Sequence, residues 1–496
     1  ILVSTAFGTI LAAAQILPTL ELVNFSTRDQ GLGGELFSNS GSVKMLLMFL
    51  YPFIFGNISK EFIPISANIG YYRENIAFYG TLTQILALSS LLILRKKKVI
   101  VALATIALGA TILALGKNSP TYILFEIPPL SFFRIPARFL FITSFSIAIL
   151  SAFVINKIED IKKINMVSII FLVIISLEIF IYWYKFNPYV EANTYLKKPH
   201  SALTLSNQLT QNYRYASMWP YLNKQIQPKD WNKETNLYLE NFLFLNPDLN
   251  MIYNISTSDY YTSLNTRRIS LFRNFYSKNI EVADRNNAKI KPFVINLLKL
   301  QAVKYLATPY LIDSNNLNLK FTFPGPENST LNIYELKDPL ARIRLVKNTI
   351  IVNTVSDLVT QIANEDFNIK DEAIFEGDIE KLKNPYNSYS IENITDKNTE
   401  LTFDVTSDGD GYLVVADSFY PGWEAKVNEK KQKITAVNGN SRGVYIDKGS
   451  NHVEFKYKPK SLQIGASISV IAHLLALLLI IYELKFFKRL SRRFQS

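Results

Sequence analysis

The chain has 496 residues, of which 48% are hydrophobic, and it contains no cysteine and only three histidines. This composition excludes a fold held together by disulfides and a histidine-rich metal site. The formal net charge is +12, but most of it lies in three short basic segments that follow apolar runs, so we interpret the charge as a membrane-topology signal and predict no nucleic-acid partner.

Six apolar runs have the length that an α-helix needs to cross a hydrocarbon core about 30 Å thick. They occupy residues 1–20, 76–94, 99–116, 139–155, 166–184 and 462–482. We therefore expect an α-helical integral membrane bundle with about six transmembrane helices. Ile1 is not a methionine and already lies inside the first run, so we expect the chain to be a fragment whose upstream part precedes it.

The basic segments fix the expected orientation. Arg95–Lys98, the 157–163 loop and the tail that starts at Glu483 are all rich in Lys and Arg, and short basic loops stay in the cytoplasm. This predicts a multi-pass protein of a bacterial cell membrane with a cytoplasmic C-terminus and with residues 185–461 outside the cell. The stretch 45–56 is too short to span and contains a proline, which favours an interfacial or re-entrant helix.

The sequence pattern of the large external region changes along its length. Residues 185–340 mix helical and strand patterns, and at 297–308 an apolar helical turn leads into a strand, which predicts an α/β domain. Residues 341–460 contain short alternating strands separated by turns, typical of a β-sandwich, as in TELTFDV (399–405) and NHVEFKYK (451–458). We expect four parts, with residues 1–184 as the membrane bundle and 461–496 as the last helix and basic tail.

Two arginines, Arg134 and Arg138, lie four residues apart in FFRIPARFLF (132–141), at the start of an apolar run. Pro136 between them suits the first turn of a helix. One interpretation is that both arginines anchor the helix at the membrane surface. The other is that they bind the phosphate of a lipid-linked substrate, because the planar guanidinium matches phosphate oxygens and a helix N-terminus adds positive potential.

Other charged or aromatic residues are weaker candidates. Glu126 would serve as a general base or bind a sugar hydroxyl, against the alternative of a solvated loop acid. Arg28 and Arg73 would complete a charged site near the membrane, against ordinary loop charge. Glu178 lies inside an apolar run and faces either the bundle interior or interfacial water. Trp423 follows a Tyr-Pro-Gly turn and either stacks on sugar rings or belongs to the sandwich core.

Several segments in their order along the chain carry a family resemblance: AAAQILPTLEL (12–22), AFYGTLTQILAL (77–88), PPLSFFRIPARFLF (128–141), LLKLQAVKYL (297–306), GYLVVADSFYPGWEAKVN (411–428) and HVEFKYKPKSLQIGASIS (452–469). The chain resembles the bacterial YfhO-type membrane proteins over nearly its whole length. The R-x-P-x-R element and the "YPGW … Y-x-P … G" ending are the most specific parts.

The resemblance implies a glycosyltransferase of the GT-C type. Such an enzyme takes a sugar from a polyprenyl-phosphate donor and glycosylates a cell-surface polymer related to teichoic or lipoteichoic acid. Its catalytic acid would lie in the first outer loop, which we expect upstream of Ile1, so no catalytic residue is assigned beyond the weak candidate Glu126. The resemblance places Arg134 and Arg138 where the lipid phosphate is expected. No cofactor is identified, and a divalent metal stays open.

Two alternatives to the enzyme stay open at this point. The first is a non-catalytic, membrane-anchored protein of the cell envelope that binds carbohydrate or assists assembly. The second is a lipid or polymer transporter, which the single ionisable residue deep in an apolar run, Glu178, disfavours.

Overall fold

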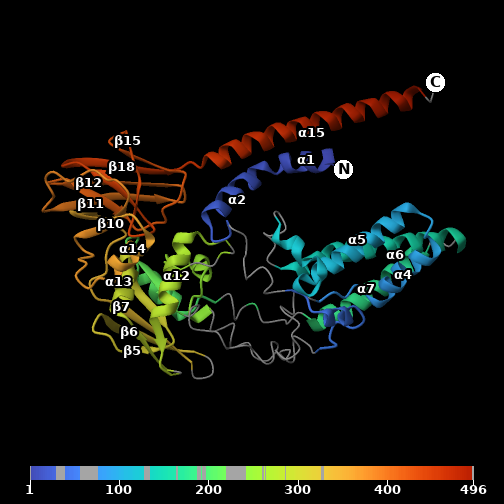
Figure 1. Ribbon diagram of the computed structural model, residues 1–496, viewed down its shortest axis with the longest axis horizontal. Helices are drawn as coiled ribbons and strands as arrows, with labels where there is room; N and C mark the ends of the chain where they lie inside the picture. The colour runs from blue at the N-terminus through green and yellow to red at the C-terminus, as the bar shows by residue number, and fades with distance from the viewer. Residues whose placement is uncertain are drawn as a thin grey trace. The chain divides into compact units, whose positions relative to one another are not determined.

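The computed structural model describes residues 2–29, 40–55, 76–127, 135–162, 166–186, 192, 197–218, 242–259, 262, 264–284, 286–325 and 329–493 (Figure 1). The chain divides into two compact units. The sheet-containing unit comprises Ile1–Thr27, Lys198–Lys224 and Leu239–Ser496, and the helical unit comprises Arg28–Lys197 and Gln225–Tyr238.

The described part of the helical unit contains four α-helices and several short 3₁₀ segments. The α-helices are α4 (Thr81–Ile93), α5 (Lys98–Ala114), α6 (Leu140–Lys162) and α7 (Val167–Phe186), and the 3₁₀ segments are η2 (Val43–Phe49), η4 (Gly116–Asn118), η5 (Pro120–Glu126) and η7 (Pro136–Phe139). The core between α4, α5 and α6 contains Leu86, Ile100, Leu150 and Val154. The stretch 45–56 falls on η2 and the turn after it, and its interfacial position stays a prediction.

The predicted bundle of six transmembrane helices, with its GT-C-like architecture, is wrong. Among the described residues, only Pro136–Ile161 and Lys460–Leu484 are long and apolar enough to cross a membrane. A third span exists only if α1 (Leu2–Leu11) and α2 (Ala13–Phe25) count as one, and these two helices meet at an angle of 79°. A large part of the described chain is β-sheet instead.

The number of spans is smaller than predicted because an apolar run and the helix that forms in it need not have the same length. In the run 76–94 the helix begins only at Thr81, because Gly80 takes a left-handed backbone conformation with φ +86°. The resulting helix of 13 residues is about 20 Å long, well short of a hydrocarbon core. The first run is interrupted at Ala12, between α1 and α2.

The first half of the sheet-containing unit is an α/β region. A four-stranded sheet has the order β1–β4–β7–β6, and a three-stranded sheet has the order β2–β3–β5. The strands are β1 (Arg214–Ser217), β2 (Ile280–Val282), β3 (Asn287–Ile290), β4 (Val303–Thr308), β5 (Leu311–Ile312), β6 (Leu317–Pro324) and β7 (Thr330–Leu336), with helices α9 (His200–Gln208), η8 (Leu249–Tyr253), α12 (Arg267–Asn279) and α13 (Pro292–Leu300). The predicted passage from helix to strand at 297–308 is confirmed, because α13 leads into β4.

The second half contains the expected β-sandwich. One sheet has the order β8–β13–β17–β16–β10–β9 and the other β11–β12–β18–β14–β15. The elements are β8 (Ile343–Val346), β9 (Asn348–Val352), α14 (Val355–Ala363), β10 (Glu372–Glu376), β11 (Tyr389–Lys397), β12 (Glu400–Ser407), β13 (Gly411–Val415), β14 (Trp423–Val427), β15 (Lys430–Gln432), β16 (Thr435–Val437), β17 (Ser441–Ile446) and β18 (Gly449–Tyr457).

The core of the sandwich draws on both sheets, as the alternation in the sequence predicts. Leu401 and Phe403 of β12 and Phe455 of β18 pack against Leu413 of β13 and Val444 of β17. The predicted limits of the external domains, at residues 185, 341 and 461, stay predictions.

The sandwich continues directly into the last helix, α15 (Lys460–Arg493), which packs along α2. The two helices lie close because Gly465 has no side chain, and a Cβ there would stand 2.5 Å from the carbonyl oxygen of Ala13. One turn further on, the hydroxyl of Ser469 accepts a hydrogen bond of 2.9 Å from the backbone N–H of Ala14. The pair therefore has a fixed register.

Candidate functional site

The end of α2 is attached to the beginning of α12. Arg267 donates from Nη2 to the carbonyl oxygen of Asn24 at 2.9 Å and from Nε to that of Ser26 at 3.2 Å. A cation at the C-terminal end of a helix satisfies carbonyl groups that have no partner in the helix and interacts well with its dipole. The backbone N–H of Thr27 also donates to the carbonyl oxygen of Asn265, at 3.2 Å. Sequence segments some 240 residues apart thus meet here.

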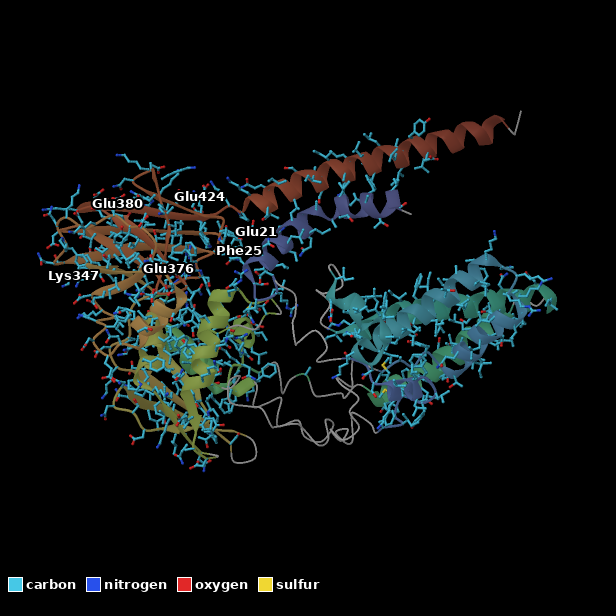
Figure 2. The ribbon with its side chains drawn as sticks, in the orientation of Figure 1. Glu21, Phe25, Lys347, Glu376, Glu380 and Glu424 are labelled. Atoms are coloured by element: carbon cyan, nitrogen blue, oxygen red, sulfur yellow. The ribbon has the colours of Figure 1, made fainter. Side chains whose placement is uncertain are left out.

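The loop 418–423, which carries the Tyr-Pro-Gly-Trp motif, contacts α2 from the sandwich side. The ring of Tyr420 lies edge-on to that of Phe25, with 5.7 Å between ring centroids. Burial and the negative charge of Glu21 raise the pKa of Tyr420 to about 12. Figure 2 labels Glu21 and Phe25 on α2.

The same loop also contacts the start of α15. Gly422 has φ +98°, and a Cβ at this position would stand 3.0 Å from the Cα of Pro459. The carbonyl oxygen of Gly422 accepts a hydrogen bond of 2.6 Å from the N–H of Lys458. We call the residues Glu21, Phe25, Tyr420, Gly422 and Pro459 the junction. The YPGW motif (420–423) and the Y-x-P motif (457–459) contact each other in the junction, through Gly422 and Pro459.

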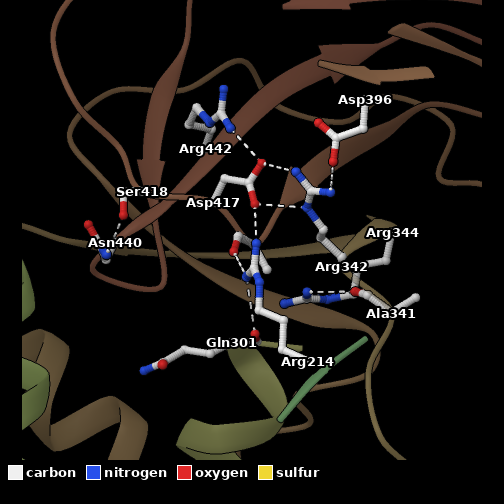
Figure 3. A network of polar contacts seen from close by, with 11 residues as sticks. Arg214, Gln301, Ala341, Arg342, Arg344, Asp396, Asp417, Ser418, Asn440 and Arg442 are labelled. Carbon is white, nitrogen blue, oxygen red and sulfur yellow. Dashed lines mark hydrogen bonds and ion pairs between the residues drawn. The ribbon is translucent and has the colours of Figure 1, made fainter. Parts of the chain in front are cut away.

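A network of buried charges begins one residue before this loop, at Asp417 (Figure 3). Its carboxylate accepts from Nε and Nη2 of Arg342 at 2.9 and 2.8 Å and from Nη2 of Arg442 at 2.6 Å. It also pairs with Nη2 of Arg214, which comes from β1 in the α/β region. Arg342 reaches a second carboxylate, that of Asp396. Asp417 therefore connects β1 and β17 with Arg342, the residue just before β8, and Arg342 extends the network to β11.

The charges in this network shift one another's pKa values. Burial alone would raise the pKa of Asp417, but the guanidinium groups of Arg214, Arg342 and Arg442 hold it well below its usual range. Burial would lower the pKa of Arg342, but its bonds to Asp417 and Asp396 raise it above its usual value. For Arg442 burial dominates, and its pKa is lowered to about 10.

Arg442 brings Trp423 into the same environment. The guanidinium carbon lies 3.8 Å from the centroid of the Trp423 ring, a close cation–π contact. Trp423 is half-buried, contacts the ring of Tyr457 and also lines a hollow of about 260 Å³ together with Phe419 and Tyr420. Its predicted contact with carbohydrate stays a prediction.

A polar cleft of about 300 Å³ lies behind the loop, between the α/β region and the sandwich. It is lined by Arg214, Thr257, Ser258, Asp259, Ile269, Phe272, Arg273, Tyr276, Leu300, Gln301, Ala416, Asp417, Ser418, Asn438, Asn440 and Ser441. The turn between β16 and β17 forms one wall. Asn438 and Gly439 both have left-handed backbone there, and the ring of Phe272 packs against Gly439.

Besides the polar cleft and the hollow of about 260 Å³, the unit contains a mostly apolar hollow of about 380 Å³ next to the loop 418–423. Phe25, Leu271, Phe419 and Tyr420 line it. Arg268 also lines this hollow, where it forms a paired salt bridge with Glu376 and donates to the carbonyl oxygen of Gly439 at 2.6 Å. Among the described residues, no group of three His, Asp or Glu side chains is arranged to hold a metal ion.

Apart from Trp423, the site residues predicted from the sequence lie elsewhere. Arg138 is exposed on η7, Glu126 is exposed at the end of η5, and Arg28 is half-buried in the turn after α2. Arg134 and Arg73 are outside the described residues. None of the described ones lines the polar cleft or joins the Asp417 network, and their roles stay predictions.

Glu178 caps a helix. Its carboxylate accepts hydrogen bonds from the backbone N–H of Thr81, at 2.7 Å, and of Leu82, at 3.4 Å. These two N–H groups belong to the first turn of α4 and have no partner inside that helix. A carboxylate is well suited to this position, because it also interacts favourably with the positive end of the helix dipole.

Reasoning from sequence missed the Asp417 network. A signal was present in the segment ARIRLV (341–346), where two arginines alternate with apolar residues in a strand. The predicted strand SRGVYID contains another arginine, Arg442, which is 2% exposed in the structure. A buried arginine is stabilised by a nearby anion, which Asp417 supplies to Arg342 and Arg442, whereas the buried Arg344 donates to the carbonyl oxygen of Ala341.

Comparison with known proteins finds a family match for one region in the second half of the chain. The sequence profile of the family described as "Bacterial membrane protein YfhO" matches residues 353–469. Over this region the chain is similar to the YfhO-type membrane proteins. The predicted family is confirmed, and the matched region contains the second sheet of the sandwich, the loop 418–423 and the first residues of α15. It is much shorter than the nearly complete resemblance expected from the motifs.

A curated relative supports the same family. It is the "Uncharacterized protein YfhO" of Bacillus subtilis (strain 168), which is 32% identical over 113 residues. The alignment covers 22% of this chain but only 13% of the relative's length. No solved structure matches. Together with the two candidate spans, the family indicates a membrane protein of the cell envelope that contacts the lipid bilayer.

Proposed function

We propose that this chain is the membrane-anchored, carbohydrate-binding part of a YfhO-type protein of the cell envelope. The observation that carries the proposal is that one loop, 418–423, borders the polar cleft, lines a hollow with aromatic side chains and contacts both α2 and α15. Aromatic faces beside hydroxyl and amide groups are suited to sugar rings, which have apolar faces and polar edges. The junction would hold such a ligand close to the membrane surface.

The experiment is a retention assay with the full chain reconstituted in lipid nanodiscs. Cell-wall polymer isolated from a Gram-positive bacterium is passed over immobilised nanodiscs, and the retained carbohydrate is measured. We expect retention by the chain and none by empty nanodiscs. Equal retention by both would refute the proposal, whatever the outcome for any single residue.

A second candidate function is glycosyl transfer from a polyprenyl-phosphate sugar to a teichoic-acid-like surface polymer. Arg138 favours it, because it is exposed on η7 at the start of the span Pro136–Ile161. A guanidinium in that position suits a lipid phosphate at the membrane surface. The test compares transfer of labelled sugar by the wild type, by Arg138→Ala and by the control Lys117→Ala. Loss of transfer in Arg138→Ala alone supports this function, and equal transfer in all three removes Arg138 from it.

A further inference from the structure

Hydroxyl and amide side chains form a large part of the lining of the polar cleft. Its hydroxyl and amide side chains are Thr257, Ser258, Gln301, Ser418, Asn440 and Ser441, with Asn438 beneath them. They come from both halves of the sheet-containing unit. Clefts between two structural layers are common places for small ligands, and a volume of about 300 Å³ lies at the lower end of ligand-pocket sizes. The size fits one small polar group, such as a single sugar ring.

The charges of the cleft balance. Two arginines, Arg214 and Arg273, face two aspartates, Asp259 and Asp417, and Arg214 is already paired with Asp417. Asp259 accepts a hydrogen bond of 2.6 Å from the backbone N–H of Ser217. A site for phosphate or carboxylate would carry an excess of positive groups. The lining therefore favours an uncharged ligand that both donates and accepts hydrogen bonds.

Three side chains in the wall carry a buried polar atom without a hydrogen-bond partner in the described structure: Ser258 Oγ, Asn438 Nδ2 and Asn440 Oδ1. A buried polar atom without a partner is costly. The set comprises one hydroxyl, one donor and one acceptor, and sugar hydroxyls satisfy all three kinds. The hydroxyl torsion of serine and the terminal torsion of asparagine are soft, so these atoms can turn toward a ligand in the cleft.

The cleft also offers apolar surface. Phe272 and Tyr276 lie one turn apart on α12, and both contribute to its lining. Both side chains are largely buried in the core, and the parts that line the cleft would give the C–H groups of a sugar ring an apolar surface. Tyr276 accepts a hydrogen bond of 2.8 Å from Gln301, so its ring is held in place.

We propose that the polar cleft binds one uncharged sugar residue, with Ser258 and Asn440 as hydrogen-bonding residues and α12 as the stacking surface. This deepens the proposed function, on which it rests, by assigning the class of ligand and the residues that recognise it.

The test uses the full chain in detergent and three probes, the methyl glycosides of glucose, galactose and N-acetylglucosamine, with binding measured by saturation-transfer NMR. We expect at least one glycoside to bind. Ser258→Ala and Asn440→Ala should each weaken that binding by about 2- to 10-fold, the effect of losing one neutral hydrogen bond. The matched controls are Ser390→Ala on β11 and Asn318→Ala on β6, both exposed and outside the cleft lining, and they should bind like the wild type.

A further variant keeps the test decisive if either alanine variant unfolds. Ser418 is exposed at the edge of the cleft, so Ser418→Trp fills the cleft without replacing a core residue. It should weaken glycoside binding more than 10-fold. Binding of all three glycosides that is unchanged in Ser418→Trp overturns the inference, and so does the absence of binding by any of them. Competition by inorganic phosphate would overturn the assignment to an uncharged ligand.

The two proposals can fail separately. If the wild type retains cell-wall polymer and Ser418→Trp retains it equally, the cleft is not the binding site although the proposed function stands. If the glycosides bind in the cleft but the wild type retains no polymer, the inference stands and the proposed function fails.

Discussion

The substitution Asp417→Asn tests whether the buried charge network stabilises the sheet-containing unit. The asparagine keeps the size of the side chain but removes the negative charge shared by three arginines, which are 16%, 13% and 2% exposed in their side chains. With Asp396, the cluster has three positive and two negative charges, a net +1, and the substitution raises this to +2. Removing one partner of a buried ion pair typically costs about 3–5 kcal/mol of unfolding free energy.

The assay is denaturant unfolding of the full chain in detergent at pH 7, followed by circular dichroism and by tryptophan emission. Trp423 reports directly, because Arg442 lies on its ring. The control is Asp366→Asn, at an exposed position, which should change the unfolding free energy by less than about 0.5 kcal/mol. A loss below about 1 kcal/mol in Asp417→Asn, the range of exposed ion pairs, would refute the reasoning.

The same variant gives a pH dependence with a definite sign. The pKa of Asp417 in the folded protein is lower than its ordinary value of 3.8. Its contribution to stability is therefore complete above about pH 4 and is lost as the pH falls toward the folded pKa. The difference in stability between wild type and Asp417→Asn should be constant from pH 5 to 7 and should narrow below about pH 4. A difference that widens on acidification would contradict the assignment.

Three further predictions concern the junction and the helix pair. Gly422→Ala should destabilise the protein more than Gly377→Ala in thermal unfolding, because both have positive φ but only the first Cβ meets a neighbour, at 3.0 Å; equal effects would show that this contact is relaxed. In an ultraviolet pH titration Tyr420 should ionise only near pH 12, and Glu21→Gln should lower its pKa by removing the nearby negative charge; an unchanged titration in the variant would contradict the influence of Glu21. In this cysteine-free chain, cysteines placed at Ala14 and Ser469 should form a disulfide under mild oxidation, and absence of the cross-link would contradict the register of α2 and α15.

The β-sandwich was predictable because its strands keep a period of two and one face is buried. Leu401, Phe403 and Val405 alternate with polar residues in the sequence, and all three are buried in the structure. Turn residues such as the NGN segment (438–440) separate the strands, and two of its residues do adopt left-handed backbone. Local pattern and burial agree in this region, so reading the sequence was sufficient.

The membrane part was overestimated for a different reason. Hydropathy reports the composition of a segment, whereas a span needs an unbroken helix of about 20 residues. Gly80 and the interruption at Ala12 shorten helices whose composition is apolar throughout. The 79° bend between α1 and α2 has no marker in the apolar pattern itself.

The candidate site could not be assembled from the sequence, because its residues come from distant segments. Arg214, Asp259 and Asp417 stand in unrelated sequence contexts, and only the topology brings them together. The YPGW and Y-x-P elements were visible as motifs, but the contact of Tyr420 with Phe25, about 400 residues away in the sequence, was not. Long-range contacts of this kind need the fold, since no local preference encodes them.

Because the connection between the sandwich and α15 is short, a tilt at the start of this helix is carried to its far end. Lys458 is bound to Gly422, and the helix starts at Lys460, so little slack separates the sheet from a helix of 34 residues. At 1.5 Å per residue that helix is about 50 Å long. A tilt of about 5° at the junction therefore moves its far end by about 4 Å, close to one helical turn. A small rearrangement around the loop 418–423 would thus move the far end of the helix by several ångströms, at the opposite surface of the membrane.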